Sequence, residues 1–427
     1  MAVKPTTTSR HAPSWSENVR SSLERTKVAG RPLMWYITGW RLGIAFLVLV
    51  LLFPFYAGTI LVNVAIPLGI YVMMAVGLNI VVGYAGLLDL GYVAFFAIGA
   101  YVQATGTFGA LQVNSTTGKT IPLPILSFWW LLPLGALVAG IFGILLGAPT
   151  LRLRGDYLAI VTLGFGEIIP IVFNYAPFWF GNTGISANPP ADINLGGFNI
   201  TFSNPLDRTP FFYLVVGVAV LVILASISLR DSSLGRAWVA IREDETAAAA
   251  SGVNLVRTKL LAYGLGAVMG GFAGVLYAAY VQAILPNDFS YYISIFVLAM
   301  IVLGGIGSVV GAVVGAIVLE FINVYLLGQM NQFFHGSLHI LTGVDFTHAN
   351  LLIFGLIMLG MILLRPQGLI PNARRKRELK GEGIAADTMS AVGVVEREER
   401  DEGVEGQGSE DETVFTGPGA DAQGRED

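Results

Sequence analysis

The chain has no cysteine, only four histidines and little charge for its 427 residues. Without cysteine it has no disulfide framework, no thiolate nucleophile and no Cys-ligated metal site. Charged residues make up 13% of the chain, whereas soluble proteins carry about 25%. Together with 54% hydrophobic residues and a mean hydropathy of +0.67, this shortage excludes an ordinary soluble enzyme, a disordered regulator and a nucleic-acid-binding protein.

The charged residues that are present leave long stretches without any Asp, Glu, Lys or Arg. Uncharged stretches of this length are typical of membrane-spanning helices, because roughly 20 helical residues cross the ~30 Å hydrocarbon layer. We therefore predict an all-α polytopic membrane protein with about ten transmembrane helices. Divided at clusters of Gly, Pro and Asn, the stretches give expected spans at 42–60, 61–82, 90–108, 125–148, 157–176, 210–229, 259–282, 291–306, 309–328 and 350–364.

The distribution of Lys and Arg predicts the orientation of these spans, because both residues are enriched in cytoplasmic loops. With a cytoplasmic N-terminus, the cytoplasmic segments hold 20 Lys and Arg residues and the external connections hold only two. Both termini are therefore expected in the cytoplasm. The predicted organisation is a cytoplasmic leader at 1–41, a transmembrane domain at 42–366 with a cytoplasmic loop at 230–259, and a basic, then acidic tail at 367–427. The tail is poor in large apolar residues, and we expect it to be disordered.

Glycine is plentiful, with 52 residues concentrated in the expected spans. The segments 264–274 and 304–316 carry small residues three or four apart, a spacing that lets helix backbones approach closely in a membrane. This pattern predicts a compact bundle without a cofactor.

The chain also lacks the motifs of common catalytic and nucleotide sites. There is no H-E-x-x-H, G-x-S-x-G or EF-hand pattern, and the GKT at 118–120 lacks the earlier Gly of a phosphate-binding loop, since position 113 is Val. His335 and His339 are four residues apart, but no third metal ligand is evident. We expect no metal, and any transport must draw energy from a gradient or from a separate ATPase.

Three carboxylates could couple transport to an ion gradient. Asp89 falls at the cytoplasmic junction before the third span, where it is expected to cost little, whereas Glu167 and Glu320 lie inside spans. Buried ionisable residues in membranes are costly and often functional. For Glu167 and Glu320 a hydrogen bond within the bundle is at least as good an explanation as a transport role.

The cytoplasmic loop 230–259 has an ordered pattern that a solvated connection does not need. Residues 236–251 are rich in Ala and are expected to form one short helix, with Gly235 before it and Gly252 and Asn254 ending it.

The composition of this helix indicates what it binds. Its mixture of Trp238, Ile241 and charged residues favours docking on another protein. The alternative is a helix lying on lipid headgroups, but the acidic run 243–245 would face an anionic leaflet.

These segments resemble the permease subunits of ATP-binding-cassette (ABC) importers for branched-chain amino acids, and among them the LivM-type subunit, with related urea and amide permeases. The similarity covers most of 60–370. Five segments in the same order carry it: GLNIVVGYAGLLDLGYVAFFAIGAY (77–101), LRLRGDYLAIVTLGFGEIIPI (151–171), GRAWVAIREDETAAAASGVN (235–254), MIVLGGIGSVVGAVVGA (300–316) and RPQGLIP (365–371). The sequence departs from the usual pattern at Pro170, where Arg or Lys is common, and at FGNTGI (180–185).

The resemblance implies a bundle like that of type II ABC importers in a bacterial or archaeal inner membrane. It also implies a second homologous permease, two cytoplasmic ATP-binding subunits and an external solute-binding protein, and an alternating-access cycle in which ATP binding moves the 236–251 helix. It places the following residues in the segment that couples to the ATPase: Gly235, Arg236, Ile241, Arg242, Glu243, Asp244 and Glu245. The residues expected to line the pathway are Asn79, Tyr84, Gly86, Tyr92, Thr162 and Glu167.

Two other classes of function compete with this interpretation. One is a gradient-driven secondary transporter or channel for a small polar solute, with Glu167 as the ion-coupling group. The other is a membrane-embedded enzyme, which the missing catalytic motifs disfavour.

Overall fold

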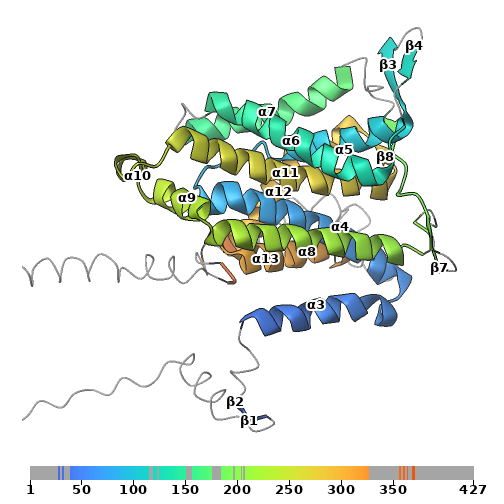
Figure 1. The fold of residues 1–427 in the computed structure, drawn as a ribbon, viewed down its shortest axis with the longest axis horizontal. Helices are drawn as coiled ribbons and strands as arrows, with labels where there is room; N and C mark the ends of the chain where they lie inside the picture. Colours follow the sequence, from blue (N-terminus) through green and yellow to red (C-terminus); the bar gives the residue numbers. More distant parts are fainter. Residues whose placement is uncertain are drawn as a thin grey trace, which may run out of the picture.

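The computed structural model shows a bundle of apolar helices (Figure 1). It describes residues 27–28, 31–32, 39–114, 119–122, 125–150, 156–175, 184–195, 198–202, 204, 207–326, 355–356, 359–360, 363 and 368–370.

The prediction of an all-helical membrane protein is confirmed. Within the described residues, six helices are long and apolar enough to cross a membrane, and three shorter apolar helices accompany them. The helices are α3 (Gly39–Tyr56), α4 (Thr59–Leu78), α5 (Val93–Phe108), α6 (Phe128–Thr150), α7 (Asp156–Tyr175), α8 (Thr209–Asp231), α9 (Ser233–Glu243), α10 (Glu245–Ala250), α11 (Leu255–Val281), α12 (Tyr291–Gly304) and α13 (Val309–Phe321). The π-helical segments η1 (Asn79–Tyr84) and η5 (Ile322–Leu326) continue α4 and α13, and the 3₁₀ turn η4 (Pro286–Phe289) precedes α12.

These helices account for nine of the ten expected spans, with boundaries that differ by a few residues. The tenth expected span, 350–364, lies mostly outside the described residues, and the five residues described there are helical. The N-terminal leader, most of the C-terminal tail, His335 and His339 also lie outside the described residues.

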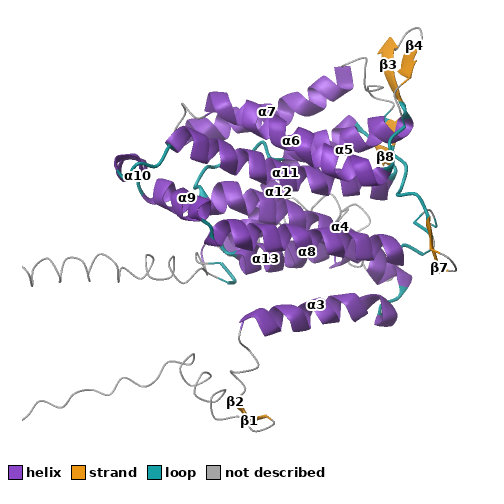
Figure 2. Ribbon diagram, viewed as in Figure 1, coloured by secondary structure: helices purple, strands orange, loops and turns teal. Residues whose placement is uncertain are grey.

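Short antiparallel strand pairs occupy the segment before α3 and several connections between helices. They are β1 (Lys27–Val28) with β2 (Arg31–Pro32), β3 (Ala110–Asn114) with β4 (Lys119–Pro122), β5 (Ile185–Ser186) with β8 (Ala283–Ile284), and β6 (Ile193–Leu195) with β7 (Phe198–Ile200). Strands β3, β4, β7 and β8 lie at one end of the bundle, and α9 and α10 lie at the opposite end (Figure 2). The Lys and Arg distribution predicts that the α9–α10 end faces the cytoplasm.

The centre of the bundle is α11, which packs against α4, α5 and α6. Small residues make these contacts possible, as the sequence predicts. A Cβ at Gly274 on α11 would overlap the backbone carbonyl of Phe96 on α5, and one at Gly99 would overlap the carbonyl of Gly271. Helices α12 and α13 also pack closely, because a Cβ at Gly315 would overlap the carbonyl of Met300. Glycine therefore sets the distance between the central helices.

Candidate functional site

The connection between α8 and α11 folds as two helices instead of the single helix expected over 236–251. The break is at Asp244, whose backbone is extended with φ −153° and ψ 114°. Its carboxylate accepts hydrogen bonds from the backbone N–H groups of Thr246 at 2.7 Å and Ala247 at 3.0 Å. Asp244 is therefore the N-cap of α10, and these two donors lower the pKa of its carboxyl below the usual value.

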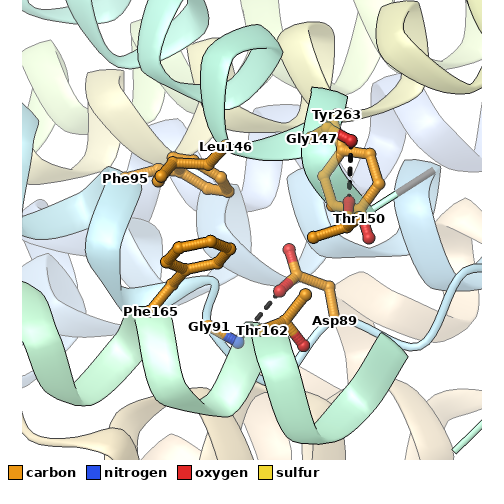
Figure 3. A pocket seen from close by; sticks show the side chains of 9 residues that line it. All are labelled: Asp89, Gly91, Phe95, Leu146, Gly147, Thr150, Thr162, Phe165 and Tyr263. Carbon is orange, nitrogen blue, oxygen red and sulfur yellow. Dashed lines mark hydrogen bonds between the residues drawn. The ribbon is translucent and has the colours of Figure 1, made fainter. Parts of the chain in front are cut away.

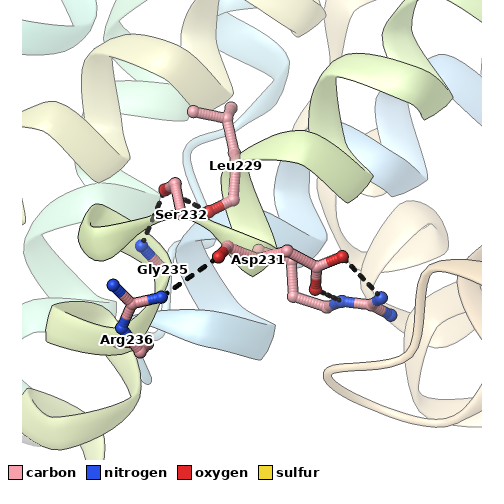
Figure 4. Close-up of polar contacts among 6 residues, drawn as sticks. Leu229, Asp231, Ser232, Gly235 and Arg236 are labelled. Carbon is pink, nitrogen blue, oxygen red and sulfur yellow. Dashed lines mark hydrogen bonds and ion pairs between the residues drawn. The ribbon is translucent and has the colours of Figure 1, made fainter.

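The entry to α9 is fixed by a second cap (Figure 4). The Ser232 hydroxyl accepts a hydrogen bond from the backbone N–H of Gly235 at 3.2 Å and donates one to the carbonyl of Leu229 at 2.6 Å. Arg236 donates from Nη1 to the carbonyl of Asp231 at 3.2 Å. These contacts set the turn between α8 and α9, so the direction of α9 depends on the end of a membrane-spanning helix.

One face of α9 is anchored to the bundle. Trp238 is fully buried, and its indole Nε1–H donates to the carbonyl of Thr258 on α11 at 2.8 Å. Ile241, one helical turn further on, is also buried. Lys259 on α11 forms an ion pair with Glu245 on α10, with Nζ and Oε1 2.5 Å apart. Glu245, predicted for ATPase coupling, thus holds α10 against α11, and Ile241, predicted for the same role, is buried in its own chain.

The indole hydrogen bond predicts a graded loss of stability at Trp238. Replacement by Phe keeps most of the packing but loses the bond to Thr258, and we expect it to lower the free energy of unfolding by about 1 kcal/mol. Replacement by Ala also leaves a cavity and is expected to cost about 3 kcal/mol or more. Thermal unfolding of the purified protein in detergent measures both changes. Trp130→Phe, at an exposed position on α6, is the matched control, and equal effects at the two positions would contradict the anchoring role.

The other face of α9 is exposed. Arg236 and Glu243 lie seven residues apart on that face, and both are exposed, as is Asp244 at the end of the helix. Trp238 and Ile241 occupy the opposite, buried side. The helix therefore has one face attached to the spans and one charged face directed away from them.

The residues predicted to line the pathway lie at several places in the bundle. Asn79 and Gly86 lie near α9, Tyr92 donates its hydroxyl to the carbonyl of Gly266 on α11 at 2.8 Å, and Tyr84 is buried in η1. In this subunit these groups fill the space between helices, and their role in a pathway remains a prediction.

Thr162 and Glu167 lie on α7, and Thr162 contacts the two residues just before Tyr92. The Thr162 hydroxyl accepts a hydrogen bond from the backbone N–H of Leu90 at 3.0 Å and donates one to the carbonyl of Ala159 at 3.1 Å. Glu167 is half-buried, one turn further along the helix.

Asp89 is buried in the structure, whereas the sequence predicts that it lies at the end of a span, where a charged side chain costs little free energy. It is only 1% exposed, with Oδ1 accepting a hydrogen bond from the backbone N–H of Gly91 at 2.9 Å. Its other oxygen points into a cavity of about 10 Å³, shared with Thr150, Thr162 and Tyr263 (Figure 3), a space that fits a single water molecule. Burial raises the pKa of Asp89 to about 6, an effect that the Gly91 N–H partly offsets. The sequence gives no sign of this burial, because α6, α7 and α11 all come from later in the chain.

Two other residues of this region were missed by sequence reasoning. Lys259 was counted only as a cytoplasmic charge, although it directly precedes the uncharged run 260–287, a position that could have indicated a partner at the edge of the bundle. Gly307 donates its backbone N–H to the side chain of Asn79 at 2.9 Å, and no sequence signal links two residues so far apart.

The comparisons with known proteins agree with this architecture. A family described as "Branched-chain amino acid transport system / permease component" matches residues 60–364. The high-affinity branched-chain amino acid transport system permease protein LivM of Escherichia coli (strain K12) is 41% identical over 355 residues, which cover 79% of this chain and 76% of the relative.

More distant relatives also match. The probable branched-chain amino acid transport permease protein LivM of Methanocaldococcus jannaschii is 27% identical over 71% of this chain and 91% of its own length. The ribose import permease protein RbsC of Escherichia coli (strain K12) is 26% identical over 62% of this chain and 76% of its own length. No solved structure matches the chain.

Apolar helices of membrane length, together with the match to a permease family, define a multi-pass inner-membrane permease. More specifically, the chain belongs to the family of permease components of branched-chain amino acid transport systems. As a member of that family it is a transport subunit that works with other subunits.

Proposed function

We propose that this chain is the LivM-type permease subunit of an ABC importer that carries branched-chain or similar amino acids into the cell. The likeness to the Escherichia coli relative supports the substrate class, because it extends over about three quarters of both chains and that relative is named for a branched-chain amino acid transport system. In this proposal a second homologous permease completes the pathway, an external solute-binding protein delivers the substrate, and two separate cytoplasmic subunits bind ATP.

The helix pair α9–α10 carries the coupling to the ATPase in this proposal. The observation that supports it is the two-sided character of α9, whose buried side is attached to α11 through Trp238 and whose exposed side carries Arg236 and Glu243. A helix that docked only on lipid has no need of an acidic residue on its exposed face. A force applied to the exposed side is transmitted to the spans, because the buried side is held by packing and hydrogen bonds.

The proposal is tested with the tagged chain co-expressed with its transport partners and purified in mild detergent. We expect a second permease and ATP-binding subunits to copurify, and the reconstituted complex to take up leucine only when ATP and the binding protein are supplied. Reversing both exposed charges, Arg236→Glu with Glu243→Lys, is expected to reduce uptake at least tenfold, by weakening the ATPase contact at about 1.4 kcal/mol per factor of ten.

The matched control is Arg257→Glu, a charge reversal at an exposed position on the first turn of α11, which we expect to leave uptake unchanged. Normal uptake by the doubly reversed variant would count against the coupling role of α9. A homo-oligomer without ATP-binding subunits, together with uptake that an ionophore abolishes, would instead favour the gradient-driven alternative with Glu167 as the coupling group.

A further inference from the structure

Arg242, in the last turn of α9, reaches back to a transmembrane helix that comes much earlier in the chain. Its Nη1 donates a hydrogen bond of 2.7 Å to the backbone carbonyl of Gly83, 159 residues away in sequence. Gly83 lies in the last turn of η1, the π-helical end of α4. Carbonyl groups at the end of a helix carry partial negative charge and lack intrahelical donors, so a guanidinium is a favourable partner there.

Glycines make room for the Arg242 side chain. Gly86 has φ +71°, and a Cβ built on it would lie 2.7 Å from Cγ and 3.2 Å from Cβ of Arg242. Gly307, with φ +82°, lies on the other side, where a Cβ would be 3.4 Å from the Arg242 Nη1 atom. Both positions have left-handed backbone that favours glycine, so the backbone of two separate segments is shaped around this one side chain.

The same carbonyl lies beside the turn between α12 and α13. The Asn79 side chain is fully buried at the start of η1, and its Oδ1 accepts a hydrogen bond of 2.9 Å from the backbone N–H of Gly307 in that turn. A Cβ on Gly83 would lie only 2.8 Å from the same nitrogen atom. We call Asn79, Gly83, Gly86, Arg242 and Gly307 the α9 joint.

The turn between α12 and α13 is also held by a segment near the C-terminal end of the described residues. The backbone N–H groups of Leu369 and Ile370 donate to the carbonyls of Leu303 and Gly304 at 2.8 and 2.9 Å. The α9 joint therefore meets a turn whose position is fixed, and it connects α9 with η1 and α4 on one side and with α12 and α13 on the other.

We propose that Arg242 is a positioning residue that keeps α9 attached to η1 and to the α12–α13 turn throughout the transport cycle. The Arg242 residue is exposed, but its Nη1 donates to the Gly83 carbonyl of its own chain, so in this proposal it transmits movement of α9 to these spans instead of serving as an ATPase contact. Trp238 and Lys259 attach the same helix pair to α11. Without Arg242, α9 follows the ATPase but moves only part of the bundle. This inference rests on the coupling function proposed above.

The first test replaces Arg242 with Gln in the complete complex, reconstituted in proteoliposomes. We expect the ATP-binding subunits to copurify as before and ATP hydrolysis to continue, while leucine uptake per ATP hydrolysed falls about tenfold, as is usual for the loss of a hydrogen bond to a charged group. Arg257→Gln is the matched control, with the same chemical change at an exposed site of the same connection, and its ratio of uptake to hydrolysis is expected to stay at the wild-type value.

The second test replaces the lost contact with a covalent bond. The absence of native cysteine in this chain allows the pair Gly86→Cys and Arg242→Cys to be introduced without competing thiols. The 3.2 Å between the two Cβ positions comes within a few tenths of an ångström of the ~3.5 Å lower end of disulfide geometry. We expect oxidation of the pair to restore the ratio of uptake to hydrolysis that Arg242→Cys alone has lost, and reduction to remove it again. Counting free thiols with a maleimide on the denatured chain reports the state of the pair.

The outcomes separate this inference from the function on which it rests. Wild-type complex without ATP-dependent uptake, or without bound ATP-binding subunits, overturns the proposed function. If wild type is coupled, then Arg242→Gln with an unchanged ratio of uptake to hydrolysis overturns the positioning role. Loss of the ATP-binding subunits from Arg242→Gln also overturns it, because Arg242 is then an ATPase contact. If oxidation of the double-cysteine variant does not restore the ratio of uptake to hydrolysis, the proposal that α9 must stay attached to η1 is overturned.

Discussion

Replacing Glu245 with Gln is expected to lower the free energy of unfolding by about 3 kcal/mol, because it leaves the ammonium of Lys259 buried without its carboxylate. The Lys259 side chain is 7% exposed and that of Glu245 is 31% exposed, so water reaches only one side of the ion pair. Urea or thermal unfolding of the purified protein in detergent measures the change.

Removing both partners separates the charge from the packing. In Glu245→Gln with Lys259→Met no unpaired charge is left inside the protein, and we expect this double variant to recover most of the lost stability. Asp231→Asn is the control, because its ion pair with Arg230 has side chains 63% and 44% exposed and such surface pairs contribute about 0–1 kcal/mol. A Glu245→Gln variant no less stable than Asp231→Asn would contradict the buried character of the pair.

This ion pair also limits which substitutions can test docking on the ATPase. Glu245 and Glu243 belong to the same acidic run, so the sequence alone would suggest reversing both charges. In the structure Glu245→Lys places a second cation beside Lys259, so lost transport could reflect a destabilised helix pair. The charge reversals at Arg236 and Glu243 leave the Glu245–Lys259 pair in place, but Arg236→Glu removes the hydrogen bond to the Asp231 carbonyl, so thermal unfolding of the reversed variant is measured alongside its uptake.

The second large effect is expected at Gly274, where α11 crosses α5. A Cβ at this position would overlap the carbonyl oxygen of Phe96 and lie 2.8 Å from the backbone nitrogen of Ala100. Backbone atoms inside a packed helix cannot move aside as a flexible side chain can. We therefore expect Gly274→Val to force the helices apart and to lower the free energy of unfolding by about 3 kcal/mol or more.

Gel filtration in detergent and thermal unfolding report this loss as a smaller monodisperse fraction and a lower midpoint. Gly217→Val is the matched control, because Gly217 lies in a membrane-length helix, α8, and a Cβ added there would have no atom within 4 Å. If the two valine variants were equally stable, the close crossing of α5 and α11 would be wrong. The comparison also controls for the general effect of valine on a membrane helix.

The spans were predictable because the membrane imposes a local requirement. A helix must remain free of charge for about 20 residues to cross the hydrocarbon layer, and this can be read from a window of the sequence without knowledge of its partners. The close approach of helices at Gly99, Gly271 and Gly274 was also predictable as a tendency, from the spacing of small residues. The identity of the facing helix was not, since every small-residue stretch carries the same signal.

The cytoplasmic helix pair was predicted in its location but not in its form. The break at Asp244 had a local signal that was overlooked, since Asp before a run of Ala is a common helix start. Asp89 shows the opposite case. Its neighbours in sequence place it at the end of a span, and only the arrival of α6, α7 and α11 removes water from around it.

The sequence by itself determined the class of protein and the approximate limits of nine spans, because each depends on hydropathy, charge or a continuous motif. Tertiary structure decided which side chains of α9 and α10 face the bundle and that Asp89 is buried. It also decided that Arg242 contacts Gly83 and that Asn79 contacts Gly307. These contacts join residues 159 and 228 positions apart. A hydrogen bond requires two atoms to meet within about 3 Å, and for such distant residues that depends on how every intervening helix packs.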